Sequence, residues 1–350
     1  MQIEKNYNLL KLNTFGVNVN TTFFAEVKSE KELKELFSFP EFKENEKIFL
    51  GGGSNVLFTK DWIGIVVLNK IKGIEITKED SENVEIRAMA GVVWNDLVLF
   101  AVNKDFWGIE NLSLVPGTVG AAPMQNIGAY GAELKETLVS VECFEIETGK
   151  KKLFLKNECE LGYRNSIFKN KVKGKYFITA INLKLSKIPK PNISYRILKT
   201  YLDENKIDVR KSKDVSEAVA SVRRSKLPDP KVLGNAGSFF KNVFVEKDKL
   251  AELLEKYPEM PYFEEETSPE SIGREIKIPA GWLIEQCGPT VETSWKGYRI
   301  GNVGVHKKQA LVLVNYGGAT GEEILNLANK ITASVKEKFG LEITPEVNLI

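Results

Sequence analysis

The sequence has few residues that bind metals or form disulfides. Among its 350 residues are one histidine, His306, and three cysteines, Cys143, Cys159 and Cys287. Because no C-x-x-C motif occurs, we expect no zinc site and no other metal site. An odd number of scattered cysteines argues against a disulfide framework and favours reduced thiols in a cytoplasmic protein. Any redox chemistry would therefore need an organic cofactor.

Long apolar runs and a strong net charge are also missing. No run of about 18 apolar residues occurs, and residues 1–10 lack the apolar core of a signal peptide, so we expect neither a transmembrane helix nor a secretion signal. A net charge of +2 gives no reason to expect a nucleic-acid or membrane partner. The 43% of hydrophobic residues are typical of a globular protein, and the length predicts two or three domains.

Glycine, by contrast, is concentrated in the segment 108–131, which holds five glycines and a single formal charge, Glu110. This segment is too apolar for a disordered linker and too rich in glycine for a helix or strand. It is typical of main chain that lies against a large ligand. A buried connection packed on a sheet fits the composition about equally well.

A second glycine-rich run, Gly51-Gly52-Gly53-Ser54-Asn55, follows a short apolar strand at 47–50. It resembles a nest of backbone N–H groups that binds an anion, although a tight turn is equally possible. It is neither a Walker A loop nor a dinucleotide-binding G-x-G-x-x-G motif. Two such loops in one half of the chain favour a pyrophosphate-containing cofactor, such as a flavin dinucleotide in a non-Rossmann fold.

Three polar residues stand out as candidates for chemistry. Arg164, in L-G-Y-R-N-S-I-F-K, is suited to bind a carboxylate or a developing negative charge, unless it lies in a solvated hairpin. Ser238 follows a small-residue turn and precedes two aromatics, which suits proton donation better than nucleophilic attack because no G-x-S-x-G elbow is present. Glu346 lies in a terminal strand, where a carboxylate is usually solvated.

Periodicity predicts a mixture of strands and helices. Helix 214–226 is expected to start at an N-cap formed by Asp214 or Ser216, helix 321–339 is expected to end at Gly340, and 257–273 is expected to be a loop. The expected strands are 22–27, 47–50, 63–68, 139–146, 176–185, 310–315 and 341–350, and the expected helices are 30–39, 92–103, 214–226, 247–256 and 321–339.

Together, several motifs resemble the UDP-N-acetylenolpyruvoylglucosamine reductase family (UDP-N-acetylmuramate dehydrogenase), flavoenzymes of bacterial peptidoglycan precursor synthesis. The resemblance covers nearly the whole chain, in the order found in the family. The motifs are N-T-F-G (13–16), L-G-G-G-S-N (50–55), V-P-G-T-V-G-A-A-P-M-Q-N-I-G-A-Y-G (115–131), G-Y-R-N-S-I-F-K (162–169), K-L-P-D-P (226–230), G-N-A-G-S-F-F-K-N (234–242), A-G-W-L-I-E-Q-C-G (280–288), V-H-K-K-Q-A-L-V-L-V-N (305–315) and P-E-V (345–347).

The resemblance implies an α+β fold with a two-part FAD-binding domain of the vanillyl-alcohol-oxidase (PCMH) type and a C-terminal α+β substrate-binding domain. The implied ranges are residues 1–70 and 71–212 for the two FAD-binding subdomains and 213–340 for the substrate-binding domain. The terminal strand 341–350 would be placed to pack back on the second subdomain.

The resemblance also implies a reaction and its partners. FAD, bound non-covalently, would be reduced by NADPH and would deliver a hydride from N5 to C3 of the enolpyruvyl group of UDP-N-acetylglucosamine enolpyruvate. Ser238 would protonate C2, which gives UDP-N-acetylmuramate. We expect a cytoplasmic monomer that binds neither nucleic acid nor membrane and serves cell-wall biogenesis, cell shape and cell division.

Residue by residue, the resemblance gives three roles. Ser238 matches the general acid, Arg164 the catalytic arginine and Glu346 the catalytic glutamate. The FAD-binding matches are Gly51, Gly52, Gly53, Ser54, Asn55, Pro116, Gly117, Thr118, Gly120, Ala121, Asn126, Ile127 and Gly128, and the substrate-binding matches are Tyr163, Tyr195, Lys226, Asn242, Tyr262, Lys296 and Gln309. Tyr262 indicates the subtype with a tyrosine-bearing substrate loop. Asn348 departs from the family, which has arginine after P-E-V.

Two other functions are compatible with parts of this pattern. Another flavin oxidase of the same superfamily would often carry a histidine or cysteine that attaches the flavin, but no such residue lies in the glycine-rich loops. A nucleotide-sugar-binding protein without catalysis would not need Arg164, Ser238 and Glu346 together. The colour of the purified protein separates a flavoprotein from a colourless binding protein.

Overall fold

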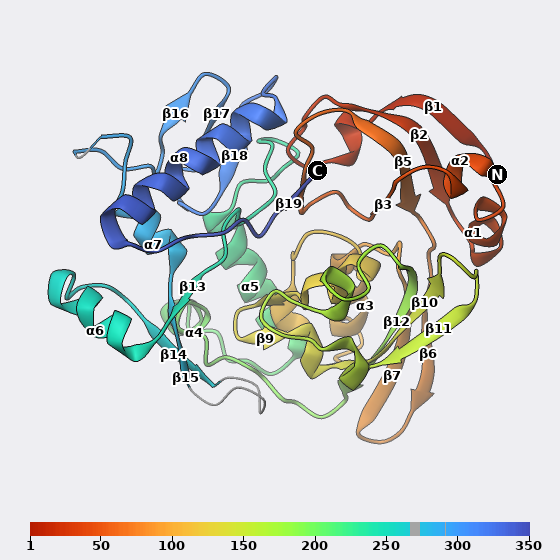
Figure 1. The fold of residues 1–350 in the computed structure, drawn as a ribbon. Helices are drawn as coiled ribbons and strands as arrows, with labels where there is room; N and C mark the ends of the chain where they lie inside the picture. The colour runs from red at the N-terminus through yellow and green to blue at the C-terminus, as the bar shows by residue number, and fades with distance from the viewer. Residues whose placement is uncertain (267–273, 291) are drawn as a thin grey trace. The chain divides into compact units, whose positions relative to one another are not determined.

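The computed structural model describes residues 1–266, 274–290 and 292–350 as a mixture of helices and strands (Figure 1). The chain divides into two compact units. Unit 1 comprises residues 1–8, 20–53 and 62–225, and unit 2 comprises residues 9–19, 54–61 and 226–350. The domain boundaries expected from the sequence stay predictions.

Unit 1 begins with a four-stranded sheet in the order β1-β2-β5-β3. β2, β5 and β3 run parallel, and β1 is antiparallel to β2. Helix α1 begins after Ser29, whose side chain accepts a hydrogen bond from the backbone N–H of Glu32. The bounds are β1 (Ile3–Asn8), β2 (Asn20–Val27), α1 (Glu30–Leu36), α2 (Pro40–Lys43), β3 (Lys47–Leu50) and β5 (Trp62–Asn69).

The second sheet of unit 1 has five antiparallel strands in the order β11-β10-β12-β7-β6. Along β7 every second side chain is buried, so one face of this strand belongs to the core. That core also contains helix α3 and the apolar residues of segment 108–131, such as Leu112 and Val119. The bounds are β6 (Ile74–Glu79), β7 (Asn83–Met89), α3 (Trp94–Val102), β10 (Leu138–Glu145), β11 (Lys151–Leu155) and β12 (Tyr176–Ser186).

Two helices, α4 (Arg196–Glu204) and α5 (Ser212–Lys226), share a small apolar cluster with Trp107. The sequence pattern did not predict α4. The predicted N-cap of α5 at Asp214 or Ser216 is wrong, because the helix already begins at Ser212. The Asp214 carboxylate instead accepts hydrogen bonds from two backbone N–H groups just before the helix, those of Arg210 and Lys211.

Unit 2 contains two three-stranded antiparallel sheets and a parallel strand pair that joins β4 to β19. The pair brings residues 56–57 and 348–349 together. The bounds are β4 (Val56–Leu57), β13 (Val243–Val245), α6 (Lys247–Lys256), β14 (Phe263–Glu266), β15 (Arg274–Ile278), α7 (Ala280–Glu285), β16 (Arg299–Ile300), β17 (Val303–Val305), β18 (Leu313–Asn315), α8 (Gly321–Phe339) and β19 (Asn348–Leu349).

Helix α8 is the element that the sequence specified best. Thr320 and Glu323 form a reciprocal capping box at its start, and Gly340 ends it in the left-handed conformation with φ 65°. Its bounds, 321–339, are those predicted. The helix start has no room for a side chain, since a Cβ on Gly321 would overlap the Phe58 carbonyl oxygen.

Three expectations about extended structure were wrong in part. Strand β14 forms inside the predicted loop 257–273, because pairing with β15 provides backbone hydrogen bonds that the sequence pattern does not reveal. The rest of that loop, 267–273, lies outside the described residues. The predicted strands 310–315 and 341–350 shorten to β18 and β19, and apart from β19 the terminal segment forms one isolated bridge, at Pro345.

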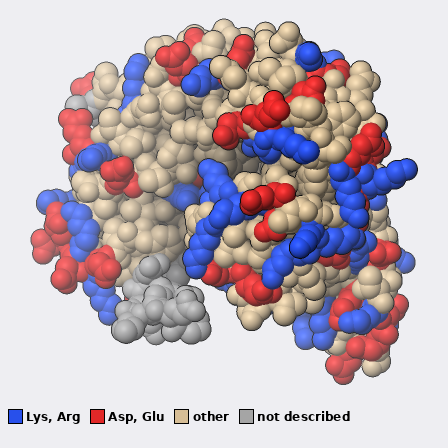
Figure 2. All heavy atoms as spheres, turned by 45° about the vertical axis from the view of Figure 1, so that its right-hand side comes forward, with Lys and Arg blue, Asp and Glu red and all other residues tan. Residues whose placement is uncertain are grey.

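Charged side chains of both signs are interspersed on the face of the molecule shown in Figure 2. The 49 basic and 47 acidic residues of the sequence nearly cancel, so local positive sites must come from a few placed side chains. Across the part of the chain that the structure describes, no helix is long and apolar enough to cross a membrane.

Candidate active site

The two glycine-rich loops of unit 1 lie against each other. A Cβ on Gly52 would lie 3.0 Å from the Cα of Gly117, and one on Gly51 would overlap the Thr118 hydroxyl. Farther along, a Cβ on Gly120 would lie 2.5 Å from the Cβ of Ala90. Part of the glycine content is therefore required because the loops pack closely on each other and on Ala90, directly after β7.

Backbone hydrogen bonds fix the second loop to the turn between β7 and α3. The N–H of Gly120 donates to the carbonyl of Ala90 at 2.9 Å, and that of Val119 donates to Val92 at 2.9 Å. A 3₁₀ helix, Val119–Gln125, then leads to the short hairpin of β8 (Gly128–Ala129) and β9 (Ala132–Glu133). The loop is therefore held as a ledge next to the end of β7, an inner strand of the five-stranded sheet.

This ledge fits a large polar cofactor better than it fits a purely structural connection. The hydroxyl of Thr118 is buried and has no hydrogen-bond partner among the described residues. Buried hydroxyl groups normally have a partner, so an unsatisfied one between two close loops indicates a ligand atom. Gly53 adds a left-handed backbone at φ 60°, a conformation that occurs in anion-binding nests.

The segment also contains a buried acid. Glu110 is 1% exposed, and its carboxylate accepts a hydrogen bond of 2.5 Å from the N–H of Gly108. Burial raises the pKa of Glu110 above its ordinary value, although the backbone N–H groups of Gly108, Glu110 and Ile109 oppose the shift. The one formal charge of the segment is thus part of the core.

Arg164 lies at the tip of a tight turn. Gly162 and Asn165 exchange two backbone hydrogen bonds of 3.2 Å, which leaves Tyr163 and Arg164 as the two turn residues. Arg164 has φ 50°, which is unusual for a residue with a long side chain. Its guanidinium lies 5.4 Å from the centre of the Tyr163 ring.

Three hydrogen bonds tie this turn to segment 115–131. The Ser166 hydroxyl donates to the carbonyl of Met124 at 2.7 Å, and the Asn126 side chain donates to the carbonyl of Gly162 at 3.1 Å. The guanidinium Nη2 of Arg164 donates to the carbonyl of Gly128 at 2.9 Å. The predicted catalytic arginine is therefore mounted on the loop predicted to bind FAD.

Ser238 lies in unit 2, in a turn that one asparagine organises. The Asn235 side chain accepts a hydrogen bond from the N–H of Gly237 at 3.0 Å and donates to the carbonyl of Leu233 at 2.8 Å. Directly after Ser238, the N–H of Phe239 donates to Leu311 at 2.7 Å. The serine therefore has a fixed backbone on both sides.

Backbone pairing brings the segment of Glu346 next to the segment that follows Ser238. Its N–H donates to the carbonyl of Phe239 at 2.7 Å, and Phe240 forms an antiparallel bridge with Pro345. The structure thus brings the segments of Ser238 and Glu346 together, although 108 positions separate them in the sequence.

Asn55, the last residue of the predicted anion-binding run, also reaches the terminal segment. Its side chain lies 3.4 Å from the carbonyl of Glu346, and its own carbonyl accepts two hydrogen bonds from Asn348, of 3.1 and 2.9 Å. Asn348 stands where the family has arginine, and here it serves this pairing.

Three of the predicted substrate-binding residues of unit 2 gather around α7. Asn242 accepts a hydrogen bond of 3.1 Å from the N–H of Ala280, and Lys296 forms an ion pair of 2.8 Å with Glu285. The side-chain oxygen of Gln309 would lie 3.4 Å from a Cβ on Gly281. Contacts of all three residues therefore lie on or next to this short helix.

The remaining predicted substrate contacts are more scattered. Tyr195 immediately precedes α4, and its side chain is 43% exposed; its ring packs edge to face on Tyr130 at 5.5 Å. Lys226 ends α5, and Tyr262 stands just before β14 with 44% exposure. His306 is buried, and burial lowers its pKa. The positive charges of the neighbouring lysines, Lys308 and Lys307, lower this pKa further.

Sequence reasoning missed the residues that hold these turns in place. Asn235 and Tyr130 were not singled out, although both lie inside quoted motifs. The Tyr130 ring packs on Tyr195, which is far away in the sequence, whereas the Asn235 side chain bonds to near neighbours in a turn that the sequence pattern does not reveal. The only available signal was the presence of asparagine and tyrosine in turns that otherwise consist of small residues.

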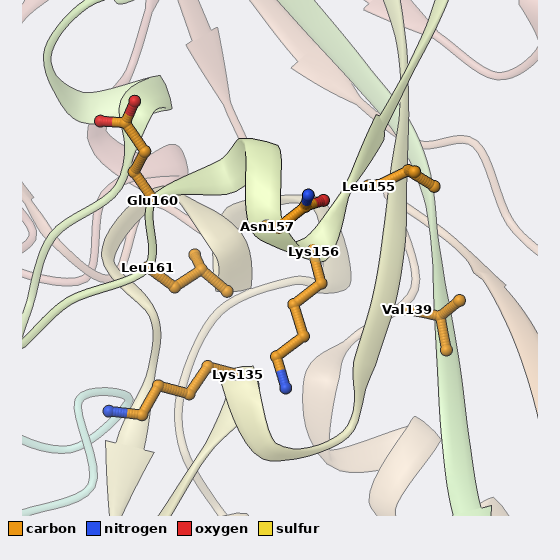
Figure 3. A pocket seen from close by; sticks show the side chains of 7 residues that line it. All are labelled: Lys135, Val139, Leu155, Lys156, Asn157, Glu160 and Leu161. Atoms are coloured by element: carbon orange, nitrogen blue, oxygen red, sulfur yellow. The ribbon is translucent and has the colours of Figure 1, made fainter. Parts of the chain in front are cut away.

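An open pocket of unit 1 is lined by none of the predicted site residues (Figure 3). It is formed at the β11 edge of the five-stranded sheet, and two of its charged residues have ion-pair partners, Lys135 with Glu133 and Glu160 with Lys171. We assign it no part in the reaction. Its lining residues are Lys135, Val139, Leu155, Lys156, Asn157, Glu160 and Leu161.

Comparison with known proteins finds two family models that match different parts of the chain. Residues 21–151 match the family model of an FAD binding domain, and residues 229–350 match that of the UDP-N-acetylenolpyruvoylglucosamine reductase C-terminal domain. Proteins named UDP-N-acetylenolpyruvoylglucosamine reductase from Flavobacterium johnsoniae and Amoebophilus asiaticus are 48% and 45% identical to this chain, each over 100% of both chains.

A solved structure of the corresponding reductase (MurB) from Thermus caldophilus has the same fold. Its TM-score is 0.65 at 22% identity, and the match covers 100% of this chain and 99% of that chain. The FAD-binding domain with its C-terminal partner defines an FAD-dependent oxidoreductase. More narrowly, the chain belongs to the UDP-N-acetylenolpyruvoylglucosamine reductase family. The predicted family, fold class and enzyme class are confirmed.

Proposed function

We propose that the protein uses FAD and NADPH to reduce the enolpyruvyl group of UDP-N-acetylglucosamine enolpyruvate to UDP-N-acetylmuramate. This would be a cytoplasmic step of peptidoglycan precursor synthesis. The observation that carries the proposal is the mounting of Arg164 on segment 115–131, within the region that matches an FAD binding domain, by three hydrogen bonds. A relative at 48% identity over the full length supports the choice of substrate.

Residues of the two glycine-rich loops would hold the cofactor non-covalently. The buried Thr118 hydroxyl and the main chain of Gly52 and Gly117 are the groups best placed to contact it. When bound, FAD would supply the hydride that reaches C3 of the enolpyruvyl group, after accepting it from NADPH. Since the loops carry little charge, binding would rely on main-chain and hydroxyl hydrogen bonds.

Arg164 would stabilise the negative charge that develops on C2 and the neighbouring carboxylate. A guanidinium suits this role because it is permanently charged and binds carboxylates through two parallel hydrogen bonds. Its bond to the Gly128 carbonyl engages Nη2, and this bond fixes the direction in which the side chain points. Such fixed charge needs no reorganisation during the reaction.

Ser238 would donate the proton to C2, and Glu346 would help Arg164 to stabilise the developing negative charge. A serine hydroxyl is a weak acid, so it must be held close to a strongly basic carbon. The fixed backbone on both sides of Ser238 provides this constraint. The bridge between Phe239 and Glu346 places the two proposed residues in one local structure.

The residues around α7 would bind the sugar-nucleotide part of the substrate. Asn242, Lys296 and Gln309 present an amide, an ammonium and a second amide near one short helix. Such a set suits a uridine diphosphate, because amides recognise the base and the sugar while an ammonium binds phosphate. Lys226, Tyr163, Tyr195 and Tyr262 would complete the contacts, and Tyr262 would mark the subtype with a tyrosine-bearing loop.

The visible spectrum of the purified protein tests this function directly. We expect a yellow protein that is bleached by NADPH without oxygen and regains its colour when UDP-N-acetylglucosamine enolpyruvate is added. A colourless protein that stays colourless with added FAD would contradict the proposal, as would reduced flavin that the substrate fails to reoxidise.

A further inference from the structure

A very short strand pair of unit 2 begins two positions after Glu346. Strands β4 and β19 pair in parallel over two residues each, Val56 with Asn348 and Leu57 with Leu349. Parallel pairing is slightly less stable per residue than antiparallel pairing, so a pair of this length provides little stability by itself. The pair therefore depends on further hydrogen bonds at its ends.

Side chains provide such a bond at each end of the pair. At the first end, the side-chain amide of Asn348 donates to the carbonyl of Asn55 at 2.9 Å, and the N–H of Asn348 donates to the same carbonyl at 3.1 Å. At the second end, the hydroxyl and the N–H of Thr59 both donate to the carbonyl oxygen of Ile350 at 2.8 Å. The backbone of residues 55–59 is thus fixed along its length.

The side chain of Asn55 extends this pairing to Glu346. Its amide nitrogen donates a long hydrogen bond of 3.4 Å to the carbonyl oxygen of Glu346, 291 positions away in the sequence. Because the carbonyl of Asn55 is held by Asn348, the main chain and the side chain of Asn55 both bind the segment 346–348. This reciprocal contact links the backbone of Glu346 to the start of β4.

Glu346 is therefore held on both sides of its Cα. Its N–H donates to the carbonyl of Phe239 at 2.7 Å, and its own carbonyl accepts the bond from Asn55. The next residue, Val347, is 3% exposed and is packed in the interior. Partners on two distant segments thus set the direction in which the Glu346 side chain leaves the backbone. A group that is oriented in advance needs no reorganisation during the reaction.

Contact with FAD is the other role open to Asn55, since the resemblance places it among the FAD-binding residues. The main chain and the side chain of Asn55 can serve different purposes. The backbone of the run 51–55 can present N–H groups to an anion, whereas the side-chain amide donates to the carbonyl of Glu346. Removal of the side chain alone should therefore affect Glu346 and leave the flavin in place.

We propose that Asn55 is a positioning residue for Glu346 and is itself held in place by Asn348. Asn348 fixes the backbone of Asn55, and the Asn55 amide fixes the carbonyl of Glu346. The hydrogen bond to Phe239 fixes the other side of the glutamate. The inference rests on the proposed function in one respect, namely that Glu346 helps to stabilise the charge that develops on the substrate.

Rapid-reaction kinetics test this role with Asn55→Ala and with Asn55→Leu, which retains the volume of the side chain without its donor. Each variant should slow flavin reoxidation at saturating substrate by roughly 10-fold, less than the factor of about 100 that a 1 Å misplacement costs. The flavin content and flavin reduction by NADPH should be unchanged. Loss of flavin or slower reduction would overturn the proposal, since the side chain would then serve the cofactor.

A double variant shows whether Asn55 acts through the glutamate. In Glu346→Ala no carboxylate is left to be positioned, so adding Asn55→Ala should cause little further slowing of reoxidation. Residues that act through one another are not additive, whereas independent residues are. The proposal is wrong if the two effects multiply in the double variant.

Thr59→Val is the matched control, because it removes a side-chain hydrogen bond from the other end of the same strand pair and keeps the shape of the side chain. It should leave the rate of reoxidation unchanged, whatever it does to the melting temperature. If Thr59→Val slows reoxidation as much as Asn55→Ala does, Asn55 only stabilises the strand pair and has no positioning role.

A second measurement does not depend on the reaction. The sequence contains two Glu-Val pairs, 26–27 and 346–347. In oxidised protein with ¹³C in the glutamate carbonyls and ¹⁵N in the valines, these two pairs alone give a carbonyl-to-nitrogen correlation, and Glu26→Gln removes the first. The remaining signal reports on the Glu346 carbonyl. It should move in Asn55→Ala and stay in place in Thr59→Val.

An unmoved signal in Asn55→Ala overturns the inference. The same measurement separates the inference from the function on which it rests. If the signal moves while the wild-type flavin is not reoxidised by the enolpyruvyl substrate, Asn55 still positions Glu346 and the proposed function fails.

Discussion

A buried asparagine organises a functional turn in each unit, but the two asparagines do so differently. In unit 1, Asn126 is fully buried and itself adopts φ 44°, while its side chain joins Glu133, Gly162 and the N–H of Lys135. In unit 2, the Asn235 side chain bonds to groups close to it in sequence, from Pro228 to Gly237.

This difference indicates how each reactive side chain is supported. The Arg164 turn depends on a partner 36 residues away, Asn126, so its geometry depends on that of segment 115–131. The Ser238 turn is made locally and is then fixed in place by backbone bridges to Leu311 and Glu346. Substitutions in the Arg164 turn or in segment 115–131 should therefore disturb flavin binding and the position of Arg164 together. Substitution of Ser238 should leave flavin binding unchanged.

Replacing Ser238 should give the largest effect and the sharpest separation of the two units. We expect Ser238→Ala to bind FAD and to be reduced by NADPH normally, because its segment belongs to unit 2. Reoxidation by the substrate should slow by about 10⁴-fold, the upper end of what loss of a general acid costs. Stopped-flow absorbance of the flavin measures both half-reactions.

Ser238→Cys provides the positive control, because a thiol can also donate a proton and should recover part of the rate. Near-normal reoxidation in Ser238→Ala would remove this residue from the acid role. Loss of flavin from Ser238→Ala would contradict the expectation that this segment of unit 2 does not affect flavin binding.

Adding a methyl group to the flavin ledge should have the next largest effect. In Gly120→Ala, the new Cβ would lie 2.5 Å from the Cβ and 3.2 Å from the carbonyl oxygen of Ala90. Such overpacking costs about 1–3 kcal/mol and should displace the loop, so we expect a marked loss of bound FAD. The ratio of flavin absorbance to protein absorbance measures the occupancy.

Gly281→Ala is the matched change in unit 2. Gly281 lies in helix α7, and its new Cβ would make ordinary contacts of 3.4 Å or more. Alanine is favoured over glycine in helices by up to about 1 kcal/mol, so this variant should keep its flavin and its stability. Equal flavin loss in both variants would show that the ledge is no more sensitive to an added methyl group than helix α7 is.

The two asparagines themselves differ in one measurable way. Asn126→Ala and Asn235→Ala should each lower the free energy of unfolding by about 1–3 kcal/mol, because buried polar groups lose their partners. Asn126→Gly should be less harmful than Asn126→Ala by about 1 kcal/mol, since only position 126 has a left-handed backbone. At position 235, glycine should give no such advantage over alanine. Urea unfolding of the four variants measures these differences.

The sequence predicted elements with strong local signals and missed those made by distant partners. Helix α8 was found in full because its capping box, apolar face and final glycine all lie within the segment. The start of α5 was missed because Asp105, 107 positions earlier, binds the N–H of Ser212. Resemblance to a family supplied the candidate site, but tertiary contacts explain how it is held.

The smallest effect should be a pH dependence from Glu110, the buried acid of the unit 1 segment. Burial raises its pKa above the ordinary 4.5, so the folded protein binds this proton more tightly than the unfolded chain does. The group's contribution to stability is therefore fully present below the unfolded pKa and is lost as pH rises through the folded pKa.

Glu110→Gln removes this titration while retaining an oxygen that can accept the N–H of Gly108. We expect the difference in melting temperature, variant minus wild type, to become more positive between about pH 4 and pH 8. Glu136→Gln is a suitable comparison, because burial also raises the pKa of Glu136 but this side chain is less enclosed, so its change should be smaller. A difference that falls with rising pH would mean that the three backbone N–H groups outweigh burial, and Glu110 would then be an ionised anchor of the flavin segment.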